Sequence, residues 1–136
     1  IGNGASASMA ADFAADLAKH AHLHTQVFTD ISLLTAVAND ISYEMIFVVP
    51  LQRRLKPGDM VVAISSSGNS PNVVRAVEFA ASQNATVVTL SAMQATNALR
   101  MLGTLNFWLP ADFYGMAETG HAAILHYWMD RVSLEG

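Results

Sequence analysis

Short apolar runs alternate with stretches of helical periodicity along this chain of 136 residues. The apolar runs predict strands at residues 26–29, 60–64, 86–90 and 105–109. Apolar positions three or four residues apart predict helices at residues 5–19, 33–37, 43–55, 72–83, 95–102 and 117–132. Strands that are apolar throughout indicate a sheet covered on both faces. The order of the elements therefore predicts an α/β fold, a three-layer sandwich in which helices flank a parallel sheet.

A run of hydroxyl side chains stands where the strand at residues 60–64 meets the next helix. Residues 64–71 read Ile-Ser-Ser-Ser-Gly-Asn-Ser-Pro. Ser70 is a good helix N-cap, and Pro71 falls at the first helical position, where its missing N–H costs nothing. The free N–H groups and the positive dipole end of that helix favour an anion, most simply a phosphate. The alternative is a polar loop before a well-capped helix, without a ligand.

This run differs from the two familiar nucleotide motifs. It lacks the Gly-Lys-Ser/Thr of a Walker loop and the glycine spacing of a dinucleotide fingerprint. A second loop, Gly2-Asn3-Gly4-Ala5-Ser6, also leads from a strand end into a helix. Its glycines permit close backbone approach, and Asn3 and Ser6 offer donors, although an ordinary turn has the same composition. Ligands of parallel sheets bind at the carboxyl ends of the strands, so the two loops together suggest a phosphorylated polyol.

Composition limits the classes of function that remain. The length suits one domain, and 52% apolar against 13% charged residues excludes disorder and predicts a large buried fraction that includes subunit contacts. The net charge is −4 and the 7 Lys and Arg residues are scattered, which argues against a nucleic-acid partner. No apolar run reaches the roughly 20 residues that span a membrane. The absence of cysteine is compatible with a cytoplasmic location.

Four segments together resemble the sugar isomerase (SIS) domain family, and within it the phosphoheptose isomerase group. They are Gly-Asn-Gly-x-Ser at residues 2–6, Thr-Ala-Val-Ala-Asn-Asp at 35–40, Lys-Pro-Gly-Asp at 56–59 and Ile-Ser-x-Ser-Gly-Asn-Ser at 64–70. The resemblance covers nearly all of the chain and indicates a single SIS domain over residues 1–136. Because Ile1-Gly2 reads as the end of a strand, we expect the first strand and the N-terminal helices of the family to precede Ile1.

The resemblance implies a fold, an assembly and a reaction. It implies a five-stranded flavodoxin-like sheet and a homotetramer with active sites between subunits. It also implies conversion of sedoheptulose 7-phosphate to D-glycero-D-manno-heptose 7-phosphate, the first step toward bacterial surface heptose. The family's phosphate-binding positions are Ser6, Ser65, Ser66, Ser67 and Ser70 in this sequence. Asn3 and Asp40 match residues near the sugar hydroxyls.

The reaction passes through an enediol, so it needs a base at carbon and an acid, base or metal at the oxygens. The family carries His-x-x-x-Glu after the first loop, with the Glu as base, and a Gln followed eight residues later by a catalytic His. These positions are Asp12 and Asp16, then Glu118 and His126. The resemblance implies Asp16 and His126 as catalytic residues. Asp12, Asp16, Glu118 and His126 could hold zinc or another divalent ion, although the set is harder than zinc usually favours.

Each of these residues has a plainer interpretation. Asp12 and Asp16 could be solvated carboxylates on a helix face, His126 a core or interface histidine, and Glu118 an acid that stabilises the start of its helix. The alternating His20, His22 and His24 are read as loop or surface histidines rather than metal ligands.

The substitutions at the catalytic positions leave two further functions open. One is a non-catalytic sugar-phosphate sensor or assembly protein, similar to the branch of the family that regulates replication initiation. The other is an isomerase for a hexose or pentose phosphate, which would share the phosphate-binding end of the site.

Overall fold

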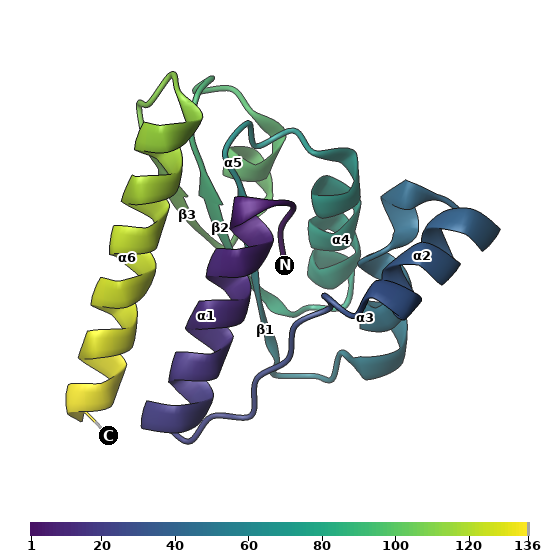
Figure 1. The fold of residues 1–136 in the computed structure, drawn as a ribbon, viewed down its shortest axis with the longest axis horizontal. Coiled ribbons are helices and arrows are strands. Elements are labelled where there is room, and N and C mark those ends of the chain that lie inside the picture. Colours follow the sequence, from purple (N-terminus) through teal and green to yellow (C-terminus); the bar gives the residue numbers. More distant parts are fainter. Residues whose placement is uncertain (136) are drawn as a thin grey trace.

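The computed structural model describes residues 1–135 as one parallel sheet between two layers of helices (Figure 1). The strands are β1 (Met60–Ser65), β2 (Thr86–Ser91) and β3 (Leu105–Trp108), in the order β1-β2-β3. The helices are α1 (Ala5–His20), α2 (Ile31–Asp40), the 3-10 turn η1 (Tyr43–Met45), α3 (Val48–Arg54), α4 (Pro71–Ser82), α5 (Ala98–Leu102) and α6 (Tyr114–Glu135). The predicted three-layer α/β architecture is confirmed.

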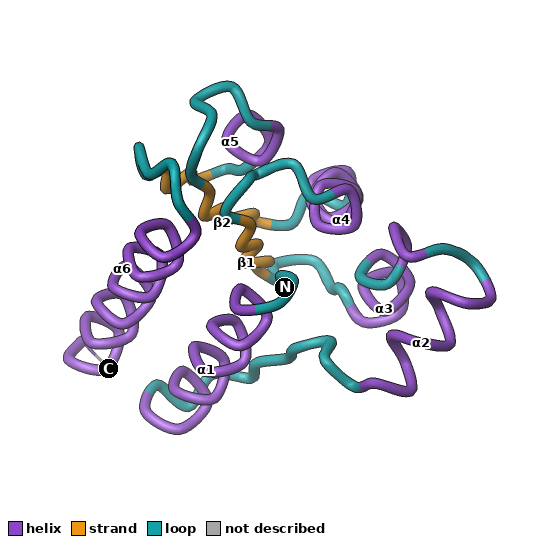
Figure 2. Tube along the Cα trace, turned by 45° about the horizontal axis from the view of Figure 1, so that its top comes forward, coloured by secondary structure: helices purple, strands orange, loops and turns teal. Residues whose placement is uncertain are grey.

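Alternate side chains of the strands pack against different helix layers. Figure 2 shows α1 and α6 on one side of the strands and α3, α4 and α5 on the other. Ile64 and Leu90 pack against α1 and α6 on one face, with Phe13 and Leu125. On the opposite face Ala63 and Val87 pack against α3, α4 and α5, with Val73, Val77 and Leu99 among their neighbours. Because both faces are covered, β1 is apolar along most of its length, and β2 combines Val and Leu with the buried hydroxyl residues Thr89 and Ser91.

The first residues of the chain lie beside β1, on the side away from β2. Gly2 forms a parallel bridge with Ile64, and the Ile64 N–H donates to the Ile1 carbonyl at 2.9 Å. This matches the expectation that Ile1-Gly2 continues as a strand end. It also places the loop after Gly2 next to the loop after Ser65, at the carboxyl edge of the sheet.

Two predicted elements are wrong. Residues 26–29 form a loop instead of a strand, because the flank of β1 is taken by Ile1-Gly2. Of these four residues only Phe28 is buried, with the Arg54 guanidinium 6.0 Å from its ring centre. Residues 43–55 split into η1 and α3, since Pro50 has no N–H to donate to the Ile46 carbonyl.

The remaining elements differ mainly in extent. α5 begins three residues later than predicted, and α6 begins earlier and ends later. The resemblance implied a five-stranded sheet, whereas residues 1–135 contain three strands and the single bridge at Gly2.

Candidate functional site

The serine run forms a tight turn between β1 and α4. The Ser65 hydroxyl lies 3.1 Å from the Ser70 hydroxyl and 3.5 Å from that of Ser67. Gly68 takes the left-handed conformation, with φ of 66°, and its N–H donates to the Ser65 carbonyl at 2.9 Å. The turn therefore gathers several hydroxyls in front of the α4 N-terminus, where backbone dipoles favour an anion.

Ser70 has the predicted place but not the predicted bond. It is the N-cap residue of α4 and Pro71 is the first helical residue, yet the Ser70 side chain makes no capping hydrogen bond. Its hydroxyl faces Ser65 instead. A cap would satisfy one N–H of the first turn of α4, so the observed arrangement leaves that end of the helix more available to a ligand.

The turn is held from behind by the segment that leads into α5. The Leu99 N–H donates to the Gly68 carbonyl at 3.0 Å, and the Ala98 N–H donates to the Asn69 Oδ1 at 2.9 Å. Asn97 is 1% exposed and packs directly against Gly68. These contacts leave no room for a side chain at residue 68, and they fix the path of the loop.

The two loops line one pocket, as the sequence predicted. The space it encloses, its open mouth included, is about 430 Å³. Its walls come from the first loop, the serine run and the start of α6: Asn3, Ser6, Ile64, Ser65, Ser66, Ser67, Ser70, Tyr114 and Glu118. Three hydroxyls of the wall, those of Ser6, Ser65 and Ser66, belong to residues only 5% exposed. A concave site rich in hydroxyl and amide donors suits a phosphorylated, hydroxylated ligand.

One of the two N–H donors of Asn3 is already taken in this pocket. Its Oδ1 accepts from the Asn72 Nδ2 at 2.8 Å and from the Tyr43 hydroxyl at 3.3 Å, and its Nδ2 donates to the Asn72 Oδ1 at 2.9 Å. Sequence reasoning missed Asn72 and Tyr43. Asn72 follows Pro71 directly, but nothing in the sequence indicates that it faces a loop far away along the chain.

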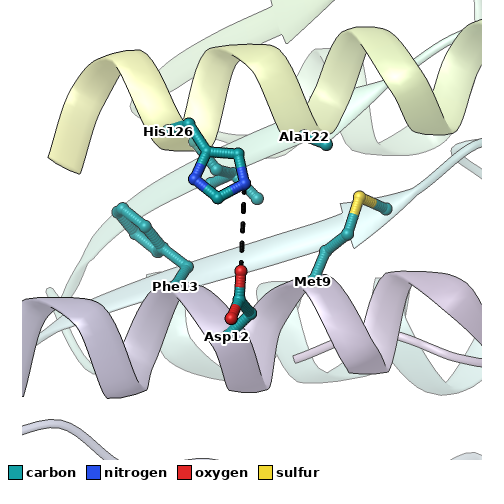
Figure 3. Close-up of a pocket in the computed structure, with 6 residues that line it drawn as sticks. Met9, Asp12, Phe13, Ala122 and His126 are labelled. Atoms are coloured by element: carbon teal, nitrogen blue, oxygen red, sulfur yellow. Dashed lines mark ion pairs between the residues drawn. The ribbon is translucent and has the colours of Figure 1, made fainter. Parts of the chain in front are cut away.

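A second, smaller hollow lies between α1 and α6. It is lined by Met9, Asp12, Phe13, Ala122, Leu125 and His126. The Asp12 Oδ2 lies 3.9 Å from the His126 Nε2 across this hollow, and both side chains are more than half exposed (Figure 3). Ring contact between Phe13, which lines the hollow, and Trp128, with centroids 5.1 Å apart, packs the two helices together beside it.

Three of the four predicted metal-ligating residues converge here. One ligand atom each from Asp12, Asp16 and His126 lies within 4.8 Å of the others. Two carboxylates and an imidazole at this spacing fit a divalent cation, with a harder donor set than a zinc site with more imidazoles. Asp12 and Asp16 share a face because they stand four residues apart on α1.

Two other predicted residues lie apart from this cluster. Glu118 lines the pocket of the serine run, about 12 Å along the α6 axis from His126 at the rise of an α-helix. Asp40 is exposed at the end of α2, accepts from the Asn39 Nδ2 at 2.8 Å, and is not among the residues that line either hollow. The three histidines at residues 20, 22 and 24 are exposed and belong to no metal-type cluster within residues 1–135.

His121 was given no role from the sequence, and the structure buries it completely. Within residues 1–135 neither of its ring nitrogens has a hydrogen-bond partner. Burial lowers the pKa of His121 below 6.5, against the opposing effects of the Ser91 backbone and the Glu118 carboxylate. The ring is therefore neutral near pH 7, one turn of α6 from a residue of the pocket wall.

Comparison with known proteins agrees with this arrangement. The model of the SIS domain family matches residues 1–92. A phosphoheptose isomerase from Shewanella sp. (strain ANA-3) is 34% identical over an alignment that covers 96% of this chain and 71% of the relative.

Solved structures show the same likeness. Phosphoheptose isomerase GmhA from Neisseria gonorrhoeae superposes with a TM-score of 0.90 at 30% identity, over 97% of this chain and 74% of that protein. A phosphoheptose isomerase from Francisella tularensis, at 24% identity and a TM-score of 0.86, shares the fold over 99% of this chain and 73% of its own.

Within the described part of the chain, no helix combines the length and apolar character needed to cross a membrane. The fold, the serine pocket and both comparisons lead to one conclusion. This chain belongs to the SIS domain family, with phosphoheptose isomerases as its relatives over nearly its whole length.

Proposed function

We propose that this chain is a phosphosugar isomerase that converts sedoheptulose 7-phosphate to D-glycero-D-manno-heptose 7-phosphate. The observation that carries the proposal is the placement of a hydroxyl-rich anion pocket and an Asp–Asp–His cluster along the same pair of helices. Ser6 lines the pocket and Asp12 lies six residues later on α1, about 9 Å along the helix axis. An extended sugar phosphate can therefore engage both regions at once.

The serines form the phosphate end of the proposed site. Ser65, Ser66, Ser67 and Ser70 would hydrogen-bond the phosphate oxygens at the start of α4, with Ser6 contributing from α1. Asn3 and Asp40 are proposed to bind sugar hydroxyls. Asn3 already lines the pocket, whereas Asp40 would act only through a contact outside the described hollow.

Asp16 is proposed as the base that moves a proton between the two neighbouring carbons. It removes the proton from one carbon to give the enediol and returns a proton to the other. His126, whose ring lies within reach of the same cluster, would transfer the proton between the two oxygens. Asp16 keeps a carboxylate at the family's base position, but its side chain is one methylene shorter than that of Glu. The distance from this carboxylate to the substrate carbon therefore depends on how closely α1 and α6 pack.

Asp12, Asp16 and His126 are the residues that would hold a divalent cation, zinc or a harder ion, whereas Glu118 lines the serine pocket and lies apart from this set. Such a cation would polarise the sugar oxygens and lower the barrier to enediol formation. The protein's own residues would in that case bind and orient the substrate.

We further propose that the protein is a cytoplasmic homo-oligomer, a tetramer like that implied by the family resemblance. Large apolar side chains are exposed where α6 begins: Phe113 by 72%, Tyr114 by 62% and Met116 by 63%. Tyr114 also lines the serine pocket. A second copy packed on this patch would bury it and close the pocket.

A non-catalytic sugar-phosphate-binding protein is the second possibility. The observation that favours it is Asp12, which stands where the family has His and faces His126 at 3.9 Å. Thermal-shift measurements with phosphosugars test this function: stabilisation without turnover would support a sensor.

The direct test is to incubate the protein with sedoheptulose 7-phosphate after chelator treatment, then with zinc, manganese or magnesium added. We expect formation of the aldose phosphate that increases with at least one of these ions. The absence of turnover under every metal condition, together with binding of the sugar phosphate, would contradict the isomerase and support the sensor.

A further inference from the structure

A buried asparagine joins the two loops of the pocket. Asn72 is the second residue of α4 and only 1% exposed. Its side-chain amide faces that of Asn3, and the two amides exchange hydrogen bonds of 2.8 Å and 2.9 Å. The two residues lie 69 positions apart in the sequence, so the pair fastens the first loop to the helix that carries the serine run.

The pair also determines what Asn3 can offer to a ligand. An asparagine side chain has two N–H donors and an oxygen with two lone pairs. In the structure the Asn3 Oδ1 accepts from both Asn72 and Tyr43, and one of its two N–H groups donates to Asn72. Within residues 1–135 its second N–H has no protein acceptor, and Asn3 lines the pocket. Asn3 therefore presents a single donor in a fixed plane, which suits an oxygen of the ligand.

We propose that Asn72 is a positioning residue, which sets the orientation of Asn3 toward the sugar and fixes its distance from the phosphate-binding serines. This inference rests on the proposed function, because it concerns the sugar end of the same site. Asn72 does not line the pocket and acts only through Asn3. Since α4 carries both Asn72 and the end of the serine run, movement of one loop is transmitted to the other.

The chemistry of burial explains why an amide stands here. Asn72 is 1% exposed, and a buried amide is costly unless it is hydrogen-bonded. Its partner is the one amide side chain in the wall of the pocket. The two hydrogen bonds with Asn3 satisfy this buried amide and at the same time hold the Asn3 side chain in place.

The test compares Asn72→Leu, Asn3→Ala and the double variant in the otherwise intact protein. Calorimetry measures binding of sedoheptulose 7-phosphate and, separately, of inorganic phosphate, and an assay measures kcat and KM. We expect Asn72→Leu to weaken binding of the sugar phosphate and to lower kcat/KM by about tenfold or more. Inorganic phosphate should bind with unchanged affinity, because the serines remain.

The double variant separates positioning from general destabilisation. In the Asn3→Ala background, Asn72→Leu should change sugar-phosphate affinity and kcat/KM by less than about twofold, because the residue through which it acts is gone. Thr89→Val serves as the matched control. Thr89 is fully buried and hydrogen-bonded to the Leu99 carbonyl at 3.2 Å, but lines neither hollow. Its substitution should lower stability and leave binding unchanged.

Three outcomes would overturn the inference. They are equal effects of Asn72→Leu in both backgrounds, an equal loss of phosphate and sugar-phosphate binding, and unchanged binding in the single variant.

Calorimetry keeps this result separate from the proposed reaction. If the protein binds sedoheptulose 7-phosphate without turning it over, the isomerase fails while the coupling between Asn3 and Asn72 is still measured. If the protein does not bind the sugar phosphate at all, both proposals fail.

Discussion

Single residues decide whether the α1–α6 hollow is a site for chemistry. The family resemblance implies that Asp12 and Asp16 stand where the family has His and Glu, which would give the cluster one more carboxylate and a base that is one methylene shorter. The packing of α1 against α6 still brings Asp12, Asp16 and His126 within 4.8 Å of one another. A shorter base on closely packed helices can serve the same proton transfer, provided that the substrate carbon lies within reach.

Asp16→Asn should lower kcat by at least about 100-fold, because the amide cannot accept the carbon-bound proton. KM should change little, since Asp16 is not among the residues that line the serine pocket. Steady-state kinetics with sedoheptulose 7-phosphate measure both quantities. Asp130→Asn, an exposed carboxylate on the same helix as His126, is the control and should keep full activity. A kcat within threefold of the unaltered protein would remove Asp16 from the mechanism.

His121 should make folding stability depend on pH. Burial lowers the pKa of its ring below 6.5, the value expected for the unfolded chain. Between these two pKa values the unfolded state binds more protons, so stability falls as the pH drops below about 6.5, by at most about 1.4 kcal/mol per pH unit. Urea unfolding at pH 7.5 and pH 5.5 measures the loss. His121→Gln should show a smaller loss than the unaltered protein, and an identical loss would contradict the prediction.

Among the elements, the turn between β1 and α4 has the most specific construction. Its hydroxyls face inward, α5 fastens it from behind, and Gly68 occupies the position where the backbone turns left-handed. Because Asn97 packs against Gly68, the turn cannot accept a larger residue without moving. The anion site and the stability of the loop therefore depend on the same residue.

Gly68→Ala should destabilise the protein by more than the approximately 1–2 kcal/mol that a left-handed conformation costs an alanine. Gly58→Ala isolates that backbone cost, since Gly58 has φ of 89° and nothing within 4 Å of an added methyl group. Urea unfolding of the two variants gives the difference that is due to Asn97. Equal losses of stability in the two variants would show that the turn accommodates the added methyl group beside Asn97 at no measurable cost in stability.

Some elements of this fold could be predicted from the sequence and others could not. The strands β1 and β2 could be predicted because strands buried on both faces are rich in apolar residues. The serine pocket could be predicted because the loops that follow adjacent parallel strands meet at one edge of the sheet. The break before α3 depends on a missing hydrogen bond at Pro50, which a pattern of apolar spacing does not show. The pairing of Asn3 with Asn72 and the separation of Glu118 from His126 depend on tertiary packing.

For the molecule as a whole, an unpartnered apolar patch lies beside the pocket. Phe113, Tyr114 and Met116 are exposed at the start of α6. In Figure 1, α6 and α2 lie on opposite sides of the molecule. Such a patch on a protein of this size is typical of a contact between subunits. A homo-oligomer in which copies meet here would bury the patch and enclose the ligand.

Met116→Glu should shift the protein toward a smaller species in analytical ultracentrifugation, because the interface would have to bury an unpaired carboxylate. Ile31→Glu introduces the same charge at a residue of α2 that is 70% exposed, and should leave the assembly unchanged. A protein that sediments as a monomer before any substitution would contradict the proposed assembly.

The most direct measurement is solvent-proton exchange during turnover. The protein is incubated in D₂O with sedoheptulose 7-phosphate and the best-supporting divalent ion, and the products are followed by NMR. We expect the heptose 7-phosphate to appear with deuterium at the carbon that receives the proton from Asp16, and Asp16→Asn to abolish both conversion and exchange. If the sugar phosphate binds but is neither converted nor exchanged under any metal condition, the isomerase is contradicted.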